Sequence, residues 1–513
     1  MKTILRTFVG CTAILFGTAC MGAVKYVPEN MKVELSLKVP GNNAVNYKLH
    51  PDKLENSYFD YEWRSDNKLP ITVFHKVEER DSCMRLTVQL TAAQDVYFNY
   101  RQLLSTGYRH DNCQFYMPGF WYRRNLRSPK KAPSFHTSDS WLVREDRLSA
   151  PLTGIFSEKE KRFMTVNRLD DFSTDALATH KEGEIILSGK TSLGFTGFEN
   201  QQGIAMLSFG FPYREAPKSY IRKLTLAPEV EAFQLMKKGE SVLLTWEIME
   251  SGADDFSDFI QHTWEHCYDT YAPKPVENSY SIADMKQVLS CFFVNSLVDN
   301  QPLVYNSGIH LKVSDCERNG QAEVGFIGRV LLNAFNAWEY GWQSNREELK
   351  VNSTKIFDSY LKNGFTQAGF FKESVNFDKG YEEPVHSIRR QSEGVYAMFH
   401  FLAYEKENGR RHPEWEQKLK RILDMFLQLQ NVDGSFPRDD LTIVDPSGGS
   451  TPSATLPLVM GYKYFKDKRY LASSKRTADY LEKELISKAD YFSSTLDANC
   501  EDKEASLYAA TAT

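Results

Sequence analysis

The spacing of apolar residues changes near residue 250, and this change constrains the fold more than any other feature. Before it, apolar and polar residues alternate in short runs such as MKVELSLKV and LPITVFHKV, separated by clusters of Gly, Pro, Asn and Asp. A two-residue period without intervening helical patterns predicts antiparallel strands, arranged as two packed sheets over residues 25–250. After it, apolar residues recur every three or four positions, which predicts helices. The fold class expected is therefore multidomain, an antiparallel β-sandwich followed by a helical domain.

The predicted domains follow from this change. The run DDFSDFIQHTWEHCYDTY predicts a helix within a linker at residues 251–280, and Ser281 is a good N-cap for the first helix of a helical domain at residues 281–513. Further helices are expected at Ala322–Tyr340, Glu347–Lys362, Gln391–Lys406, Glu414–Gln430, Ala454–Tyr464 and Tyr470–Ser487.

The first 20 residues have the layout of a bacterial secretory signal. Lys2 and Arg6 precede a short apolar run, and small residues follow it. These small residues end in Gly17-Thr-Ala-Cys20, a stretch that resembles a lipoprotein cleavage site at which Cys20 becomes lipidated. We expect an exported protein, periplasmic or associated with the outer membrane, that touches a membrane only through this signal or a lipid anchor.

Composition excludes some partners and leaves others open. The formal charge is −5 and there is no long Lys/Arg block, so nucleic acid is not an expected partner. Aromatic residues make up 13% of the chain, which suits either sugar-binding platforms or larger cores. The oligomeric state is not predicted.

Cysteine spacing predicts neither a metal nor a cofactor. Beyond the signal the chain has an even set of cysteines without a C-x-x-C pair, and no His stands at metal-finger spacing. Cys83 and Cys113 are each near an expected strand end and could form a disulfide. Buried free thiols are the alternative, because a chain of this size does not need covalent staples.

The helical half contains loops of a recurring style. LKNGFTQAGFF, LQNVDGSFPRDD and ISKADYFSSTLD each follow a predicted helix at intervals of roughly 60–70 residues, the length of a helical hairpin repeat. Helix, DGSF turn and helix after an N-terminal sandwich resembles the six-hairpin (α/α)6 toroid of glycoside hydrolases and polysaccharide lyases, which often carries a β-supersandwich in front. The resemblance covers residues 25–513. It implies an enzyme that degrades an oligo- or polysaccharide.

The resemblance also raises a question about the end of the chain. A closed toroid of six hairpins needs more helices than the seven or so expected after Ser281, and Asp502 to Ala512 reads as the start of another. We therefore expect an incomplete toroid, with an open helical array as the alternative.

Two reaction classes would use the polar loops differently. A glycoside hydrolase needs paired carboxyl groups from different loops, about 5–5.5 Å or 6.5–9.5 Å apart. The candidates for this catalytic role are Glu393, Asp433 in NVDGSF and Glu323 in NGQAEVGF, each of which could instead be a helix cap or a surface acid.

A uronate-specific lyase instead needs a Tyr or His to move a proton and cations to hold the substrate carboxylate. Tyr381 and His386 suit the first role, and Arg389, Arg390 and Gln391 suit substrate binding. Sugar stacking is a further expectation for Trp338, Trp342 and Phe436, with packing between hairpins as the alternative. A third hypothesis is a glycan-binding protein without catalysis, or an inactive truncated product.

Overall fold

The computed structural model divides the chain into two compact units, which we call the β-unit and the helical unit. The β-unit comprises Met1–Leu126 and Lys130–Ala272, and the helical unit comprises Arg127–Pro129 and Pro273–Thr513. The structure describes residues 27–55, 57–80, 83–126, 133–170, 175, 182–222, 225–295, 297–300, 303–306, 309–311, 316–318, 321–325, 329–376, 381–382, 387–437, 450–487, 492–494, 499–501 and 503–513.

The predicted secretory signal and Cys20 lie outside the described residues. Within the described residues, none of the helices combines the length and the apolar character that a membrane crossing requires.

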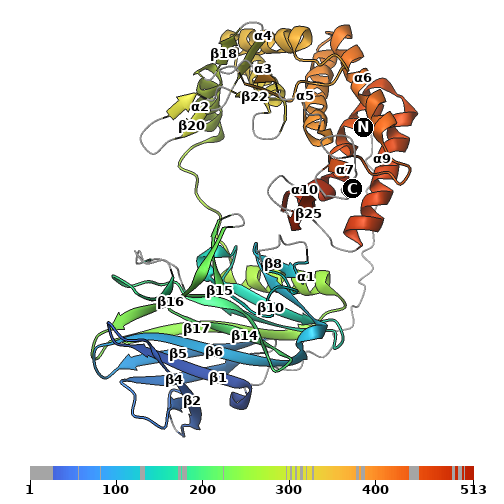
Figure 1. The fold of residues 1–513 in the computed structure, drawn as a ribbon. Helices are drawn as coiled ribbons and strands as arrows, with labels where there is room; N and C mark the ends of the chain where they lie inside the picture. Colours follow the sequence, from blue (N-terminus) through green and yellow to red (C-terminus); the bar gives the residue numbers. More distant parts are fainter. Residues whose placement is uncertain are drawn as a thin grey trace, which may run out of the picture. The chain divides into compact units, whose positions relative to one another are not determined.

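The β-unit is built from long strands in three connected ladders (Figure 1). The strands are β1 Met31–Lys38, β2 Val45–Lys53, β3 Tyr61–Arg64, β4 Ile71–Glu79, β5 Cys83–Ala92, β6 Val96–Arg109, β7 Cys113–Met117, β8 Trp121–Arg123, β9 Trp141–Arg144, β10 Leu152–Ser157, β11 Arg162–Arg168, β12 Gly183–Ile186, β13 Phe195–Gln201, β14 Ile204–Phe211, β15 Arg214–Arg222, β16 Thr225–Met236 and β17 Ser241–Gly252. The first ladder runs β2-β1-β6-β14-β13-β9 and the second runs β3-β4-β5-β17-β11-β10-β7-β8. Strand β2 also pairs with β3, and a third ladder, β9-β15-β16-β12, ends in a parallel pair.

The core of the β-unit lies between the first two ladders. The ring of Phe115 on β7 stacks on Phe198 of β13 with centroids 3.9 Å apart, and Phe209 of β14 meets Trp246 of β17 at 5.3 Å. These rings are almost completely buried. Because successive strand residues face opposite sides, alternate apolar residues from both ladders fill this layer.

The predicted linker helix is α1, Phe256–Tyr271, and it packs on the second ladder. Asp255 caps it by accepting hydrogen bonds from the backbone N–H groups of Ser257 and Asp258. Its Phe259 fills the space above Gly154, where an ideal Cβ would lie only 2.5 Å from the Phe259 ring. Gly154 therefore lets the helix approach the sheet closely.

The alternative of buried free thiols is confirmed for Cys83 and Cys113, and the disulfide between them is wrong. Both thiols are free and buried. Cys83 begins β5, whereas Cys113 begins β7 elsewhere in the same ladder, and the Cys113 thiol lies 3.2 Å from the carbonyl oxygen of Arg109. Cys267 on α1 is also a buried free thiol.

The helical unit consists of helices joined by short loops and small sheets. The helices are α2 Ile282–Asn295, α3 Val330–Gln343, α4 Glu347–Asn363, α5 Ile388–Glu407, α6 Pro413–Leu429, α7 Ser450–Ser453, α8 Thr455–Phe465, α9 Lys468–Leu481 and α10 Lys503–Ala512, and a π-helical turn at Glu482–Ile486 extends α9. The strands are β18 Leu297–Asn300, β19 Leu303–Asn306, β20 Ile309–Leu311, β21 Cys316–Arg318, β22 Gln321–Glu323, β23 Ser374–Asn376, β24 Tyr381–Glu382, β25 Phe492–Ser494 and β26 Asn499–Glu501. The predicted cap of α2 is present, since the Ser281 hydroxyl accepts the Asp284 N–H at 3.1 Å while the Asp284 carboxylate accepts the Ser281 N–H at 3.0 Å.

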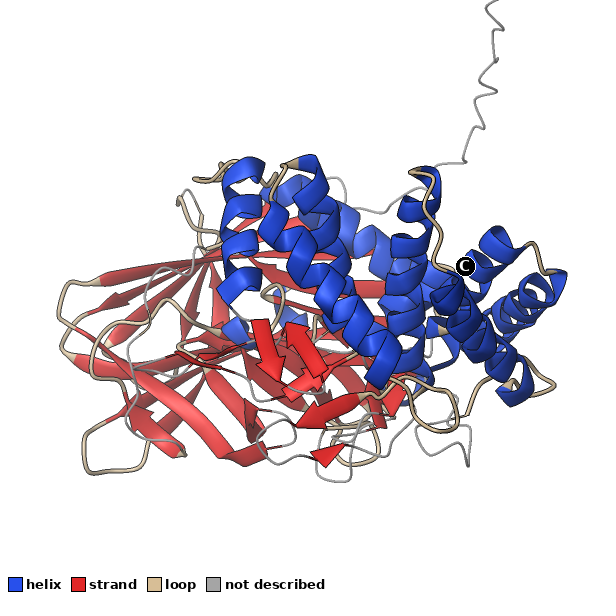
Figure 2. Cartoon of the chain, turned by 90° about the horizontal axis from the view of Figure 1, so that it is seen from above, coloured by secondary structure: helices blue, strands red, loops and turns tan. Residues whose placement is uncertain are grey.

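Three helical hairpins form the body of this unit. Short connections join α3 to α4, α5 to α6 and α8 to α9, and the first helices of the hairpins contact one another in the order α3, α5, α8. Figure 2 shows these helices lying side by side. Their shared core includes a tight contact between Phe357 of α4 and Phe401 of α5, with centroids 4.2 Å apart.

The predicted helix at 322–340 starts too early. Residues 321–323 form β22, and α3 begins only at Val330. Ala322 and Glu323 have good helix propensity, but pairing with β23 overrides it, with Glu323 opposite Ser374.

Candidate functional site

The polar loop singled out in the sequence leads into the first turn of α5. Ser387 caps this helix by accepting the Arg390 N–H at 3.4 Å. Before the helix, β22, β23 and β24 form a small sheet in which Asn376 pairs with both Gln321 and Tyr381. The fold thus places Glu323 and Tyr381 in one small sheet next to the start of α5.

Three side chains surround the carboxylate of Glu393 on α5, and we call the four residues the Glu393 cluster: Glu393, Arg389, Arg329 and Tyr508. The Tyr508 hydroxyl donates to Glu393 Oε1 at 2.6 Å. Arg389 Nε donates to the Tyr508 oxygen at 3.1 Å and lies 3.6 Å from Glu393 Oε1. Arg329 Nη2 lies 3.5 Å from the same carboxylate oxygen. One carboxylate oxygen is therefore held by a phenol and two guanidinium groups.

The second oxygen of Glu393 faces the strand that carries Glu323. An ideal Cβ on Gly325 would lie 2.6 Å from Glu393 Oε2 and 2.8 Å from the Cα of Arg390. Gly325 follows Glu323 by two residues, so the segment just after β22 approaches the α5 backbone closely only because Gly325 lacks a side chain. The structure thereby brings the chain around Glu323 close to Glu393.

Tyr508 is held in its protonated form. Burial, followed by the negative charge of Glu393, raises the pKa of Tyr508 to about 12. The Arg389 guanidinium lies over its ring, 4.9 Å from the centroid. At neutral pH this phenol is consequently a hydrogen-bond donor set between a base and a cation.

Two buried side chains, those of Glu373 and Gln391, hold the first turn of α5 in place. Glu373, fully buried, accepts hydrogen bonds from the Ser387 N–H at 2.5 Å and from the Gln391 amide at 2.9 Å. The Gln391 amide also exchanges two hydrogen bonds with the backbone of Phe371, each 2.9 Å long. Gln391 was expected to bind substrate, but it is fully buried and its amide holds Phe371 and Glu373. Its role is to position α5.

Arg390 faces this support and not the Glu393 carboxylate. Its Nη1 lies 3.8 Å from Glu373 Oε2. Arg389 and Arg390 are adjacent in sequence, yet Arg389 forms an ion pair with Glu393 and Arg390 forms one with Glu373. Successive residues on a helix point in different directions, so the two arginines serve different carboxylates.

Asp433 lies in the turn after α6, and its carboxylate closes that turn. Asp433 Oδ1 accepts the Ser435 N–H at 3.0 Å and the Ser435 hydroxyl at 2.6 Å. This is a local Asx-type turn. Among the described contacts, none joins Asp433 to the Glu393 cluster.

The three predicted sugar-stacking aromatics have different surroundings. Phe436 is fully buried and packs against Phe426 in the hairpin core, and its predicted role in substrate binding stays a prediction. Trp338 donates to Glu405 at 3.3 Å and packs against Phe401, again within the hairpin core. Trp342 is 44% exposed, and its ring contacts the Lys350 ammonium at 4.5 Å and the Arg410 guanidinium at 4.9 Å. Of the three side chains, Trp342 is the most exposed.

Two other predicted residues lie partly or wholly outside the residues that the structure describes. The backbone of Tyr381 is placed in β24, but its side chain is outside the described residues, and so is the whole of His386. Conversely, sequence reasoning missed Tyr508, Arg329 and Glu373. Tyr508 lies 115 residues from Glu393 in the chain, so spacing could not connect the two.

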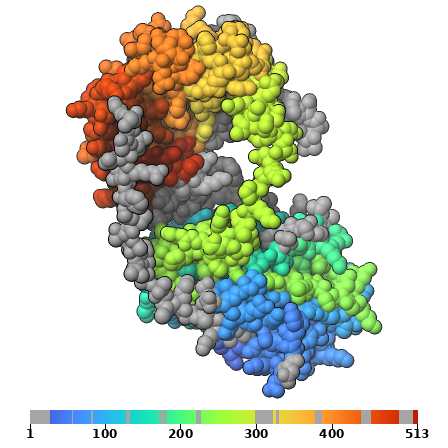
Figure 3. All heavy atoms as spheres, turned by 180° about the vertical axis from the view of Figure 1, so that it is seen from behind, coloured from blue at the N-terminus to red at the C-terminus, as the bar shows by residue number. Residues whose placement is uncertain are grey.

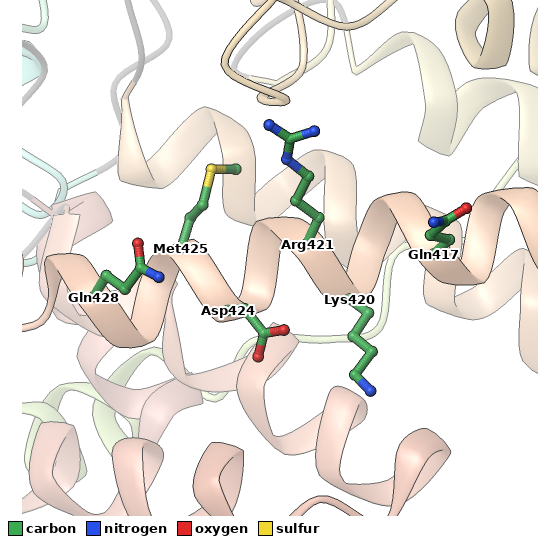
Figure 4. A pocket seen from close by; sticks show the side chains of 6 residues that line it. All are labelled: Gln417, Lys420, Arg421, Asp424, Met425 and Gln428. Atoms are coloured by element: carbon green, nitrogen blue, oxygen red, sulfur yellow. The ribbon is translucent and has the colours of Figure 1, made fainter.

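A hollow lies on the surface of α6 (Figure 4). It is lined by Gln417, Lys420, Arg421, Asp424, Met425 and Gln428. Arg421 donates to the carbonyl of Ala368 at 2.9 Å, and Asp424 accepts from Arg469 at 3.1 Å and from Tyr470 at 3.0 Å. Its charged groups are engaged in holding neighbouring segments, so the Glu393 cluster is the better candidate site.

Comparisons with known proteins place the chain in no family. No family model matches the sequence, and no curated protein matches it. Among solved structures, an unsaturated glucuronyl hydrolase from Bacillus sp. GL1 matches with 15% identity and a TM-score of 0.31, over 39% of this chain and 55% of that one. A protein of Salmonella enterica described as a possible member of the GH105 family matches with 13% identity and a TM-score of 0.32, over 45% and 66%. A polysaccharide lyase matches with 12% identity and a TM-score of 0.30, over 88% of this chain and 75% of that one.

These likenesses carry no argument here. The TM-scores lie between 0.30 and 0.32, and the matches span 55% of the Bacillus enzyme and 66% of the Salmonella protein. The function proposed below therefore depends on the site itself.

Proposed function

We propose that this chain is a glycan-degrading enzyme, a glycoside hydrolase that acts on an oligo- or polysaccharide at the Glu393 cluster. The observation that carries the proposal is the Glu393 carboxylate, which accepts the Tyr508 hydroxyl at 2.6 Å and faces two guanidinium groups at 3.5 and 3.6 Å. Such a group can act as the base or nucleophile of glycoside hydrolysis. Glu323, two residues before Gly325, which lies beside Glu393 Oε2, is the proposed second carboxyl group.

The arginines suggest which sugars are taken. Guanidinium groups bind carboxylates through paired hydrogen bonds, and Arg329 and Arg389 both approach the Glu393 carboxylate. The carboxylate of an acidic sugar would bind to these same guanidinium groups. We therefore expect acidic oligosaccharides to be better substrates than neutral ones.

A uronate-specific polysaccharide lyase is the second candidate, and Tyr508 is the observation that favours it. Its phenol lies between Arg389 and Glu393, and burial raises its pKa to about 12. In an elimination the Arg389 guanidinium would hold the substrate carboxylate, the Glu393 carboxylate would take the proton α to it, and the Tyr508 phenol would protonate the leaving oxygen.

The wider setting belongs to the same proposal. We infer that the three hairpins are part of an (α/α)6 toroid preceded by a β-supersandwich, and that the protein is exported to the periplasm or the outer membrane, with Cys20 as a candidate lipid anchor. The support is the hairpin order α3, α5, α8 and the basic, then apolar, then small residues at the N-terminus.

The test uses the full chain with panels of neutral and acidic oligosaccharides, followed by mass spectrometry of the products. A hydrolase adds one water per cleaved bond, whereas a lyase adds none and yields an unsaturated product that absorbs ultraviolet light. Glu393→Gln is expected to lower kcat/KM by about 100-fold or more. Asp358→Asn, which changes an exposed carboxylate on α4, is the matched control and should change it less than about two-fold.

The outcomes separate the three hypotheses. Under hydrolysis Glu393→Gln is the most damaging variant, whereas under elimination Tyr508→Phe is at least as damaging. Retained activity in both variants would refute the Glu393 cluster as the site. Binding without turnover by the folded wild-type chain would instead indicate a glycan-binding protein.

A further inference from the structure

A second group of reactive side chains lies in the β-unit, on strands β5 and β17 of the second ladder and on helix α1. We propose that Cys83, Glu247 and His266 form a binding site for a divalent zinc-like cation. One ligand atom from each lies within 4.8 Å of the other two. The proposal goes beyond the glycan chemistry assigned to the helical unit, because none of these residues belongs to the Glu393 cluster.

The two strand residues face the same side of the second ladder. Glu247 on β17 pairs directly with Arg85 on β5, and Cys83 lies two residues before Arg85. Residues two apart on a strand share a face, so Cys83 is the diagonal neighbour of Glu247. The Cys83 sulfur lies 3.6 Å from Glu247 Oε2.

The third ligand comes from α1, which packs on this face. His266 Nε2 lies 2.7 Å from Glu247 Oε1, and Thr270, one helical turn further on, donates to the same oxygen at 3.1 Å. Phe259 and Cys267 of α1 are buried in the same cluster as Cys83, which fixes the helix on the sheet. The ligands are therefore held by two strands and one helix, not by loops.

The separations suit a tetrahedral ion. Zinc bonds of about 2.0–2.1 Å to nitrogen or oxygen and 2.3 Å to sulfur imply ligand atoms roughly 3.3–3.7 Å apart. The Cys83 to Glu247 distance of 3.6 Å already fits, and the His266 to Glu247 hydrogen bond of 2.7 Å would open by less than about 1 Å. Thiolate, imidazole and carboxylate are all zinc ligands, and water can take the fourth position.

The three proposed ligands are buried enough to hold a cation and exposed enough to let it enter. Cys83 and Glu247 are buried, whereas the His266 side chain is 23% exposed, which leaves an entry route from the helix side. The charge of Arg80 acts on the Cys83 thiol and therefore opposes a metal here. The same is true of Arg85, whose Nη2 lies 3.7 Å from Glu247 Oε2 and whose side chain is 30% exposed. It can turn toward solvent when a cation binds.

Zinc binding to the full chain tests this inference. With zinc alone in a chelator competition, wild type should bind stoichiometrically, and Cys83→Ser, Glu247→Gln and His266→Gln should each weaken binding by at least about 10-fold, the loss that even outer-shell partners produce. Cys113→Ser is the matched control, since Cys113 is another buried free thiol of the β-unit. It should bind as wild type does.

Two further measurements distinguish a loss of zinc binding from a loss of folding. Cobalt should give thiolate charge-transfer absorption in wild type and not in Cys83→Ser, and zinc should raise the melting temperature of wild type but not of His266→Gln. His266 is partly exposed, so this variant should fold even where Glu247→Gln does not. Wild-type affinity in Cys83→Ser or His266→Gln, or no zinc binding by wild type, would overturn the site and leave a hydrogen-bonded cluster only.

Discussion

His75 makes the stability of the β-unit dependent on pH. It is completely buried on β4, its Nε2 lies 2.6 Å from the Tyr100 hydroxyl of β6, and burial lowers its pKa to about 3. An unfolded histidine titrates near pH 6.5. Between these values the unfolded chain binds a proton that the folded chain does not, so the free energy of unfolding falls as the pH drops from about 6.5 to 3.

Denaturant unfolding at pH 7 and pH 4 checks this expectation. His75 should remove about 3 kcal/mol of stability at pH 4 relative to pH 7, and His75→Gln should abolish that part of the loss. Burial raises the pKa of Glu145 in the same unit to about 7, which acts in the opposite direction, so the comparison is between wild type and variant at each pH. Equal pH dependence in the two proteins would contradict the prediction.

Gly325 is the second residue whose environment leads to a sharp expectation. A Cβ there would meet Glu393 Oε2 at 2.6 Å and the Arg390 backbone at 2.8 Å. Because the backbone atom cannot move aside cheaply, Gly325→Ala should destabilise the helical unit by about 1–3 kcal/mol. Gly252→Ala is the control, since the nearest atom to its added Cβ lies 3.7 Å away. Similar melting temperatures for the two variants would disprove the close approach.

At this scale the sequence predicted only part of the candidate site. Glu393, Arg389 and Arg390 stand in one conspicuously polar stretch, so their grouping could be seen in advance. Tyr508, 115 residues beyond Glu393, and the buried support from Glu373 depend on how separate segments pack. Phe436 and Gln391 were predicted from sequence to bind substrate, and only the packing of the chain shows that both side chains are fully buried.

Among the elements, the turn between α5 and α6 is held by a buried carboxylate, that of Glu405. Glu405, near the end of α5, accepts hydrogen bonds from Arg410 at 2.6 and 2.8 Å and from His412 at 2.9 Å, as well as from Trp338 of α3. Burial alone would raise the pKa of Glu405, but the bonds from Arg410 and His412 hold it below its usual value. The ionised carboxylate therefore fixes the turn between the two helices.

Glu405→Ala should destabilise the helical unit by about 2–3 kcal/mol, because charge-assisted hydrogen bonds are lost and the Trp338 N–H loses its acceptor. Glu407→Ala, at an exposed position on the same helix, should cost less than about 0.5 kcal/mol. Chemical denaturation of both variants measures the difference. A Glu405→Ala variant as stable as Glu407→Ala would show that the turn is held by other contacts.

Helices with a strong apolar period were predictable to within a few residues, as α4 and α6 illustrate. The short strands between them were not. In β22 the residues Ala322 and Glu323 favour a helix locally, and only the distant partner Ser374 makes them a strand. Local propensity decides long amphipathic segments, whereas pairing across the chain decides short ones.

At the scale of the whole molecule, the order of a β-rich part before a helical part followed from the change of period alone. Each unit has its own apolar core. Residues 273–280 between α1 and α2 are exposed at every position. Figure 3 shows the surface of the chain coloured by residue number, with this part of the sequence in lime green. We therefore expect the units to unfold in separate steps, since each unit has its own core and the segment that connects them is exposed.

Calorimetry and limited proteolysis can test this expectation together. Two thermal transitions should appear at pH 7, and the transition of the β-unit should move to lower temperature at pH 4 in wild type but less in His75→Gln, while the transition that Glu405→Ala shifts should not depend on His75. Brief protease treatment should cut first within 273–280, because exposed backbone is the preferred site of cleavage. If a single transition moved as a whole with either substitution, the two units would be one cooperative body, and the exposed segment would not be the boundary between independently stable cores.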